Sequence, residues 1–169
     1  MTKTLVAVAS KHGSTFEIAE AIGRALTAEG VPNTIRPVDE VTKLDGYDAV
    51  ILGSAVYMGS WMDPALVFAA THTARLTGMP VWLFSSGPIG APPHPTQEHA
   101  VNVDEVMAMT GARGHQLFSG RLDRHSLGFG ERALAIGVRA PEGDFRDWDA
   151  IAQWGHSVGR QLQAHASPG

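Results

Sequence analysis

An apolar run near the start of the chain leads through a short polar turn directly into a helical pattern. Thr4 to Ala9 is almost continuously apolar, which is typical of a strand buried on both faces of a parallel sheet. The turn reads A-S-K-H-G-S-T, from Ala9 to Thr15, and the helical pattern begins at about Ser14. A helix N-terminus leaves backbone N–H groups unpaired and carries partial positive charge, so such a turn suits a phosphate group. This unit predicts an α/β fold with an anion site after the first strand.

The residues of the turn exclude several classes of phosphate-binding protein. The P-loop pattern G-x-x-x-x-G-K-[ST] is absent, and only Gly13 stands where the dinucleotide pattern requires several glycines. Ala9 and Ser10 also lack the acidic residues of a receiver domain. Gly13 allows the backbone to approach an anion closely, and Ser10, Ser14 and Thr15 add hydroxyl donors.

Strand-like and helix-like segments alternate along the whole chain. Pro37 favours an edge position for the second strand, as in a doubly wound sheet. Right-handed crossovers then predict an α/β fold with a five-stranded parallel sheet of order 2-1-3-4-5, helices on both faces, and one domain over residues 1–169. The expected strands are Thr4 to Ala9, Asn33 to Val38, Asp48 to Ser54, Met79 to Ser86 and His115 to Ser119; the expected helices are Ser14 to Glu29, Ser60 to Gly78, Thr96 to Gly111 and Asp144 to His165, with a helical turn or a loop at Asp39 to Tyr47.

The last expected helix shows the clearest amphipathic pattern. Its apolar or small residues recur at steps of three and four, which predicts one buried face. The members of that face are Trp148, Ile151, Gly155, Val158 and Leu162.

Composition narrows the function further. The hydrophobic fraction of 44% and the charged fraction of 18% are those of a globular protein, and the net charge of −4 argues against a nucleic-acid partner. The chain has no cysteine, which excludes disulfides and thiol chemistry, and its 8 histidines form no H-E-x-x-H pair, so no metal is expected. The first apolar run is too short for a signal sequence or a membrane span, so we expect a cytoplasmic protein.

Three loops are expected to meet outside the carboxyl ends of the strands, where ligands bind in such sheets. The first is the phosphate turn. The second reads S-A-V-Y-M-G-S-W-M, from Ser54 to Met62, and its backbone groups can reach the heteroatoms of a planar ring. Of its two aromatic residues, Tyr57 is the better candidate for a ring contact, whereas core packing explains Trp61 equally well.

The third loop reads S-S-G-P-I-G-A-P-P-H-P, from Ser85 to Pro95. Main-chain groups at the start of this loop can contact a pyrimidine edge. The loop has no aromatic residue, which leaves one face of a bound ring open for a substrate. His94 and His99 are near enough in sequence to be proton donors, although an exposed position is the more frequent explanation for a loop histidine.

The phosphate turn resembles that of flavodoxins, [ST]-x-[ST]-G-x-T: Ser10, Gly13 and Thr15 match, and His12 replaces a hydroxyl residue. With G-S-A-V-Y-M-G-S-W, L-F-S-G-R-L-D-R and G-D-F-R-D-W-D-A-I, the whole chain resembles flavodoxin-like FMN proteins, within them the branch containing menaquinone-dependent protoporphyrinogen oxidase. The resemblance implies non-covalent FMN and assigns no catalytic residue. By the same resemblance, the phosphate contacts are Ser10, His12, Gly13, Ser14 and Thr15, and the isoalloxazine contacts are Ser54, Ala55, Val56, Tyr57, Met58, Gly59, Ser85, Ser86 and Gly87.

Charge separates two kinds of flavoprotein. Carboxylates around the flavin of a low-potential flavodoxin raise the energy of the anionic reduced form, because like charges in a partly dry site repel. Here the phosphate turn has no acid, the second loop has none before Asp63, and the third has none before Glu98. We therefore expect an oxidoreductase whose partner is a quinone or a redox protein. Two alternatives stay open: an electron-transfer flavodoxin without its own substrate, and a degenerate flavodoxin domain that only binds partners.

The segment from Gly120 to Ala140 interleaves arginines with apolar residues. Such a segment could meet the propionates of an anionic tetrapyrrole substrate, or an anionic membrane surface near a quinone; a solvated connector is the plainer alternative. We expect no membrane span and leave peripheral membrane contact open. The arginines are Arg121, Arg124, Arg132 and Arg139.

Overall fold

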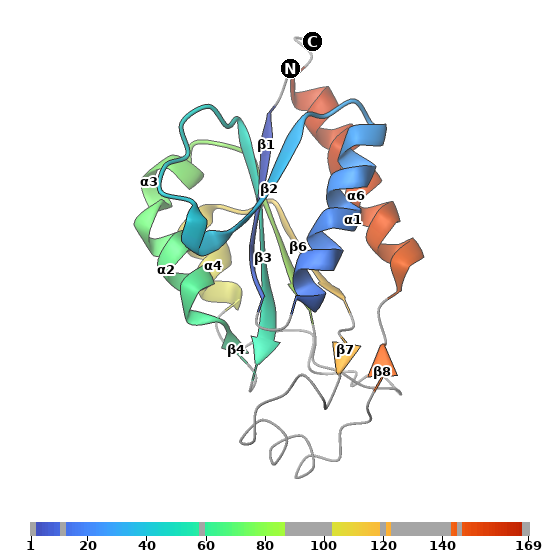
Figure 1. Cartoon of the computed structure of the whole chain (residues 1–169). Helices are drawn as coiled ribbons and strands as arrows, with labels where there is room; N and C mark the ends of the chain where they lie inside the picture. Colours follow the sequence, from blue (N-terminus) through green and yellow to red (C-terminus); the bar gives the residue numbers. More distant parts are fainter. Residues whose placement is uncertain are drawn as a thin grey trace.

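The computed structural model describes residues 3–10, 13–57, 60–86, 103–118, 121–122, 143–144 and 147–166, and Figure 1 shows how its elements are arranged. The strands are β1 (Thr4–Ala9), β2 (Asn33–Pro37), β3 (Ala49–Tyr57), β4 (Ser60–Trp61), β5 (Val81–Ser86), β6 (Gly114–Phe118), β7 (Arg121–Leu122) and β8 (Gly143–Asp144). The helices are α1 (Ser14–Ala28), α2 (Asp63–Thr71), α3 (Thr73–Leu76), α4 (Val103–Thr110) and α6 (Trp148–Ala166), with a 3-10 turn, η1, at Val38–Glu40.

Five parallel strands form the main sheet in the order β2-β1-β3-β5-β6. Because β4 only turns back on β3 in an antiparallel pair, this is the predicted order 2-1-3-4-5, which is confirmed. Helices α1 and α6 cover one face of the sheet, and α2, α3 and α4 cover the other (Figure 1). A separate antiparallel pair joins β7 to β8.

The central strands are buried on both faces, as their continuous apolar sequences predict. Every residue of β1 and of β5 is buried. Alternate residues of a strand point to opposite faces, so Leu5 contributes to the core under α2 and α4 while Val6 contributes to the core under α1 and α6. This two-sided burial explains why the strands show no polar alternation.

Helices α1 and α6 pack closely because small residues meet at their contact. A Cβ added to Gly155 would lie 2.7 Å from the Cβ of Ala25, so the helices could not approach this closely with a larger residue.

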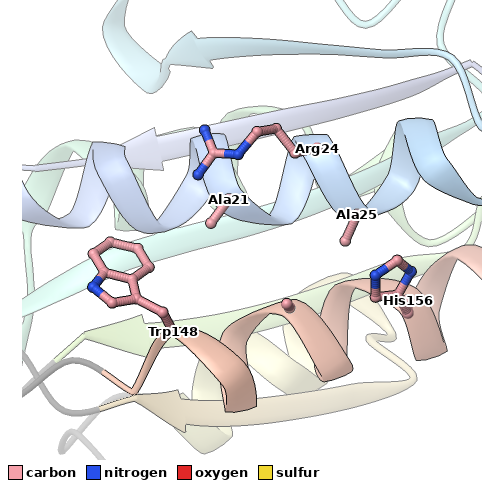
Figure 2. Close-up of a pocket in the computed structure, with 6 residues that line it drawn as sticks. Ala21, Arg24, Ala25, Trp148 and His156 are labelled. Atoms are coloured by element: carbon pink, nitrogen blue, oxygen red, sulfur yellow. The ribbon is translucent and has the colours of Figure 1, made fainter.

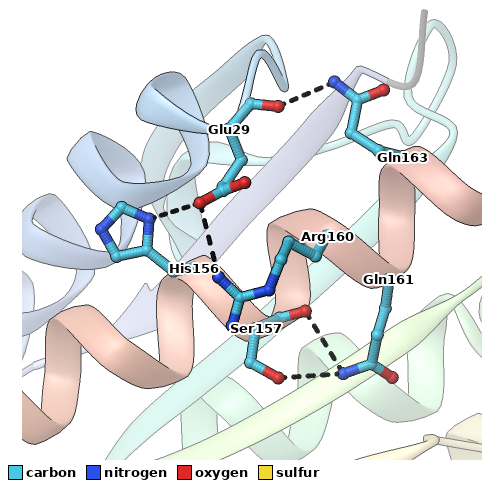
Figure 3. Close-up of polar contacts among 6 residues, drawn as sticks. All are labelled: Glu29, His156, Ser157, Arg160, Gln161 and Gln163. Carbon is cyan, nitrogen blue, oxygen red and sulfur yellow. Dashed lines mark hydrogen bonds and ion pairs between the residues drawn. The ribbon is translucent and has the colours of Figure 1, made fainter.

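At the end of α1, Figure 3 shows Glu29 held by α6: its Oε2 lies 2.8 Å from His156 Nδ1 and 3.6 Å from Arg160 Nη1. Gln163 Nε2 donates to the Glu29 carbonyl at 2.8 Å.

Two helices differ from the sequence-based expectation. The helix expected from Ser60 to Gly78 is divided into α2 and α3 at His72, where the Thr73 hydroxyl donates to the Ala69 carbonyl at 2.8 Å and competes with the helical ladder. The last helix begins at Trp148 rather than Asp144, because the Asp147 carboxylate caps it by accepting from the Ala150 N–H at 3.0 Å.

The buried face of α6 is confirmed except at its first residue. Ile151, Val158 and Leu162 are fully buried, but Trp148 is 41% exposed. The expectation for Trp148 was wrong because it lies in the first turn of α6, on the outer surface between α6 and α1.

A glycine in the central strand makes the sheet sensitive to one methyl group. A Cβ at Gly53 would overlap with the ring of Phe84, which cannot withdraw because it is fully buried and packs against Phe118 and Trp154. We predict that Gly53→Ala lowers the free energy of unfolding by about 1–3 kcal/mol, measured by chemical denaturation. The control Gly114→Ala places its Cβ 3.5 Å from Trp82 and should change stability by less than about 0.5 kcal/mol. Equal effects of the two substitutions would contradict this packing.

The histidine between α2 and α3 gives stability a pH dependence. Burial lowers the pKa of His72, whose ring lies 4.7 Å from that of Phe68, below its usual value of 6.5. The unfolded chain therefore binds this proton more readily than the folded chain, so stability falls as the pH drops below about 6.5. We predict that the loss of unfolding free energy between about pH 7 and about pH 5 is smaller in His72→Asn than in the wild type. An identical loss in both proteins would refute this contribution.

Candidate functional site

The loops predicted to bind a ligand start from one edge of the sheet. The first turn of α1, the β3–β4 hairpin, the start of α2 and the end of β5 all lie at the carboxyl ends of the parallel strands (Figure 1). The register pairs Ala9 with Ser54 and Ser54 with Ser85, so the three described loop starts are adjacent.

The turn before α1 leaves its backbone donors available. Gly13 has φ of 84°, the left-handed region that favours glycine, and a Cβ there would meet nothing within 4 Å. The Gly13 N–H donates to the Ser10 hydroxyl oxygen at 3.0 Å, which closes the turn. The first helical hydrogen bond runs from the Glu17 N–H to the Gly13 carbonyl, and no side chain among the described residues caps the helix. The N–H groups of Ser14, Thr15 and Phe16 precede this first helical bond and are therefore oriented for an anion outside the helix.

Thr15 adds a buried hydroxyl without a partner. Its side chain is 1% exposed, and its Oγ1 makes no hydrogen bond to any described residue. Leaving such a hydroxyl unsatisfied costs about 1–3 kcal/mol, so a protein with no use for it would gain by replacing it. Of the described side chains, only Thr4, at the opposite end of β1, has an oxygen in the same condition.

The second loop is a hairpin rather than the irregular turn expected from sequence. Strand β3 continues past Ser54 to Tyr57, and β4 pairs back on it, with Val56 opposite Trp61. The Ser54 hydroxyl donates to the Ala55 carbonyl at 2.8 Å and accepts from the Met62 N–H at 3.0 Å, which fixes the start of α2. The hydroxyl of Ser54 is thus used within the protein, and its main chain is paired with β1 on one side and β5 on the other.

The core explanation for Trp61 is confirmed. Trp61 is 2% exposed, and its Nε1–H donates to the Ser85 Oγ at 2.7 Å. A ring enclosed in this way has no face left for stacking on a ligand. The Ser85 Oγ also lies 2.7 Å from the Nε2 atom of His115 on β6. No sequence signal pointed to His115, because only the register of β5 and β6 brings it near this edge.

The remaining predicted contacts divide between described and undescribed residues. Ala55, Val56 and Ser86 lie at the edge, at the ends of β3 and β5. For Ser14 and Tyr57 the structure describes the backbone only. His12, Met58, Gly59 and Gly87 lie outside the described residues, as do His94 and His99, so their predicted roles stay predictions.

A surface groove lies elsewhere, between α1 and α6. Figure 2 shows Arg24, Trp148 and His156 around three small side chains. None of its lining residues is a predicted ligand contact, and it is formed by helix flanks rather than by strand ends. It is therefore separate from the candidate site.

The fold defines a flavodoxin-like α/β protein whose first helix starts without a side-chain cap among the described residues. A family model described as a flavodoxin domain matches residues 5–147, and the chain belongs to this family. The family indicates FMN as the cofactor.

Solved structures with the same fold match nearly the whole chain. A flavodoxin from the domain Archaea superposes with a TM-score of 0.64 at 18% identity and covers 96% of this chain and 99% of that one. Oxidised Flavodoxin 1 from Bacillus cereus has a TM-score of 0.61 at 20% identity, with 98% and 100% covered. The TM-scores and coverages show that this chain shares the fold of these proteins.

Among curated proteins, the chain is similar to protoporphyrinogen IX dehydrogenase (quinone) of Escherichia coli strain K12. The identity is 27% over 85 residues, which make up 49% of this chain and 47% of that protein. The chain thus matches about half the length of this curated relative.

The described residues fit the phosphate of FMN. The positive φ of Gly13, the uncapped start of α1 and the unpartnered hydroxyl of Thr15 supply donors and space at one place. Oxygen atoms of a phosphate accept hydrogen bonds from N–H and O–H groups, so they would satisfy the donors that the protein leaves unpaired.

A substitution of Thr15 should affect FMN affinity and the stability of the FMN-free protein differently. We predict that Thr15→Val weakens FMN binding by about 10–100-fold, because a bond to a charged phosphate is lost. The same change should leave the stability of the FMN-free protein unchanged or raise it by about 1 kcal/mol, because an unsatisfied hydroxyl is removed. Isothermal titration and chemical denaturation measure the two effects.

Thr4→Val is the matched control for Thr15→Val. It removes the other buried hydroxyl without a described partner, at the start of β1, the end of that strand away from the turn that precedes α1. It should have the same effect on stability and none on FMN affinity. Equal FMN affinity in the two variants would exclude Thr15 from the phosphate site.

Proposed function

We propose that this protein is an FMN-dependent oxidoreductase that uses a quinone as its electron acceptor and a reduced anionic tetrapyrrole as its substrate. We infer the FMN site from the buried hydroxyl of Thr15, which has no described partner and lies beside the uncapped start of α1. The relative from Escherichia coli, a protoporphyrinogen IX dehydrogenase (quinone), supports the reaction class.

The phosphate turn would hold the cofactor through backbone and hydroxyl donors. The N–H groups at the start of α1 and the Thr15 hydroxyl would bind phosphate oxygens, with Ser10 closing the turn behind them. His12 and Ser14 are the further predicted phosphate contacts.

The flavin ring would lie against the ends of β3 and β5. Main-chain groups of Ala55, Val56 and Ser86 are at this edge, where they can orient a planar heterocycle. Bound FMN supplies two-electron or stepwise one-electron transfer. The enclosed indole of Trp61 and the lack of an aromatic residue in the third loop support a ring with one face open to substrate.

The charges near this edge favour an enzyme over a low-potential carrier. Across the three loops the nearest acids in sequence are Glu17, Asp63 and Glu98, and the described side chains of Glu17 and Asp63 are exposed. Because these three loops contribute few carboxylates, they would impose little electrostatic penalty on an anionic reduced flavin. A less negative potential suits electron transfer to a quinone.

An arginine-rich segment supports an anionic substrate. It leaves the described structure after Leu122 in β7 and returns at Gly143 in β8, and these residues pair directly. Both short strands lie beyond the end of β6, at the same end of the molecule as the start of α1 (Figure 1). Arg124, Arg132 and Arg139, in the intervening sequence, could pair with propionates. None of the helices in the described part of the chain has the length and apolar character needed to cross a membrane.

An electron-transfer flavodoxin is the second candidate. Its support is the structural match to an archaeal flavodoxin, which covers 96% of this chain and 99% of that one. A cytoplasmic location stays a prediction under both functions.

The first experiment is an FMN titration of the desalted protein, followed by turnover with protoporphyrinogen and a soluble menaquinone analogue. We expect saturable one-to-one binding, a shifted flavin spectrum and quinone-dependent oxidation. Redox titration should give closely spaced one-electron potentials. FMN binding with two widely separated potentials, a strongly negative second one and no turnover would instead identify a carrier. Absence of FMN binding would reject both functions.

Arg132→Ala tests the substrate assignment, with Arg36→Ala on the exposed edge strand β2 as control. We expect Arg132→Ala to raise KM for protoporphyrinogen several-fold without changing FMN affinity, whereas Arg36→Ala should change neither value. Unchanged kinetics in Arg132→Ala would remove this arginine from the substrate site.

A further inference from the structure

Three side chains from three different strands, two of them buried and His115 half-buried, form a hydrogen-bonded chain beside the candidate site. Trp61 of β4 donates from Nε1 to Ser85 Oγ of β5 at 2.7 Å, and Ser85 Oγ lies 2.7 Å from His115 Nε2 of β6. Trp61 is 2% exposed and Ser85 is fully buried. We refer to these residues as the Trp61–Ser85–His115 chain.

The chemistry of the three groups gives the chain a direction. An indole N–H can only donate, so Ser85 Oγ is the acceptor of the first bond. The hydroxyl group of Ser85 has one hydrogen to donate. The Nε2 atom of a neutral His115 can accept this hydrogen bond when the imidazole ring carries its own hydrogen on Nδ1. With these two bonds, the indole N–H and the hydroxyl of Ser85 are both satisfied inside the core, and neither is left for a ligand.

The chain connects the two walls of the proposed flavin site. Trp61 ends the β3–β4 hairpin, and the next residue, Met62, donates its N–H to the hydroxyl of Ser54 on β3. Ser85 begins the third loop and pairs with Ser54 in the sheet. The β3–β4 hairpin and the end of β5 at Ser85 and Ser86 are therefore tied together through buried side chains.

We propose that His115 is a positioning residue for the flavin edge: it holds the Ser85 hydroxyl, and through Ser85 it fixes Trp61 and the hairpin relative to the end of β5. The inference rests on the proposed function, because it requires FMN to bind at this edge. His115 itself would act through Ser85 rather than by touching the cofactor.

Two residues provide controls for the variants of the chain, one on β6 and one buried in the core. Gln116 follows His115 on the same strand, its side chain is exposed, and it bonds only locally to the Leu117 carbonyl at 3.3 Å. Thr110 is a fully buried residue whose hydroxyl bonds to the Val106 carbonyl at 2.8 Å within α4, away from the strand ends. Gln116→Leu therefore matches His115→Leu in strand position. Thr110→Val matches Ser85→Ala in the loss of a buried hydroxyl.

The test uses ¹⁵N-labelled full-length protein and reads the indole N–H signals of its 4 tryptophans. We expect His115→Leu and Ser85→Ala each to shift the Trp61 indole signal in the FMN-free protein. Each should also weaken FMN binding by about tenfold, because one buried hydrogen bond is lost. The double variant should bind FMN no more weakly than either single variant, since both interrupt the same chain. His115→Gln, which can place an amide group near the position of Nε2, should restore most of the affinity.

Several outcomes would overturn the inference. An unmoved Trp61 indole signal in both single variants would show that the chain does not hold Trp61. A folded His115→Leu protein with wild-type FMN affinity, or additive losses in the double variant, would remove the positioning role while leaving the proposed function intact. Losses of the same size in Gln116→Leu or Thr110→Val would attribute the effect to general destabilisation. Failure of the wild type to bind FMN would reject the proposed function and, with it, this role of His115.

Discussion

Parallel pairing of β1 with β3, and of β3 with β5, is the constraint on which the rest of the structure depends. Most residues of these strands are buried, so both faces of the sheet must be covered, and the connections have to cross from one end of the sheet to the other. The carboxyl ends of the strands then collect the loops that begin after β1, β3 and β5. Ser85 and Ser86 terminate β5, and Ser54 lies beside them on β3, opposite the last residue of β1.

At this edge the protein uses its hydroxyl groups in two ways. The hydroxyls of Ser54 and Ser85 are bound inside the protein and hold the hairpin and the strand end in place. The hydroxyl of Thr15 is buried and has no described partner, next to helix N–H groups that are also unpaired. Serine and threonine thus share a location but divide into scaffold and ligand donors, a distinction that depends on neighbours in space.

The fold could be predicted from the sequence more completely than the site. Runs such as Thr4 to Ala9 indicate buried strands locally, crossover handedness predicts a parallel sheet with helices on both faces, and Pro37 favours an edge position for the second strand. Local patterns could not show that β3 would run on into a hairpin, because that depends on pairing with β4. They also missed the break at His72 and the exposure of Trp148. The contact of His115 with this site could not be predicted, because its partner, Ser85, lies 30 residues away in sequence.

The packing of α6 against α1 has a consequence for synthesis on the ribosome. Apolar residues of α1 and of the sheet, including Ile22 and Val6, share one core with Ile151, Val158 and Leu162 of α6. Translation delivers α1 and the five parallel strands well before α6, so this face stays uncovered while the residues between them are made. The nascent chain therefore exposes the apolar surface that α6 later covers, and the docking of α6 ends that exposure.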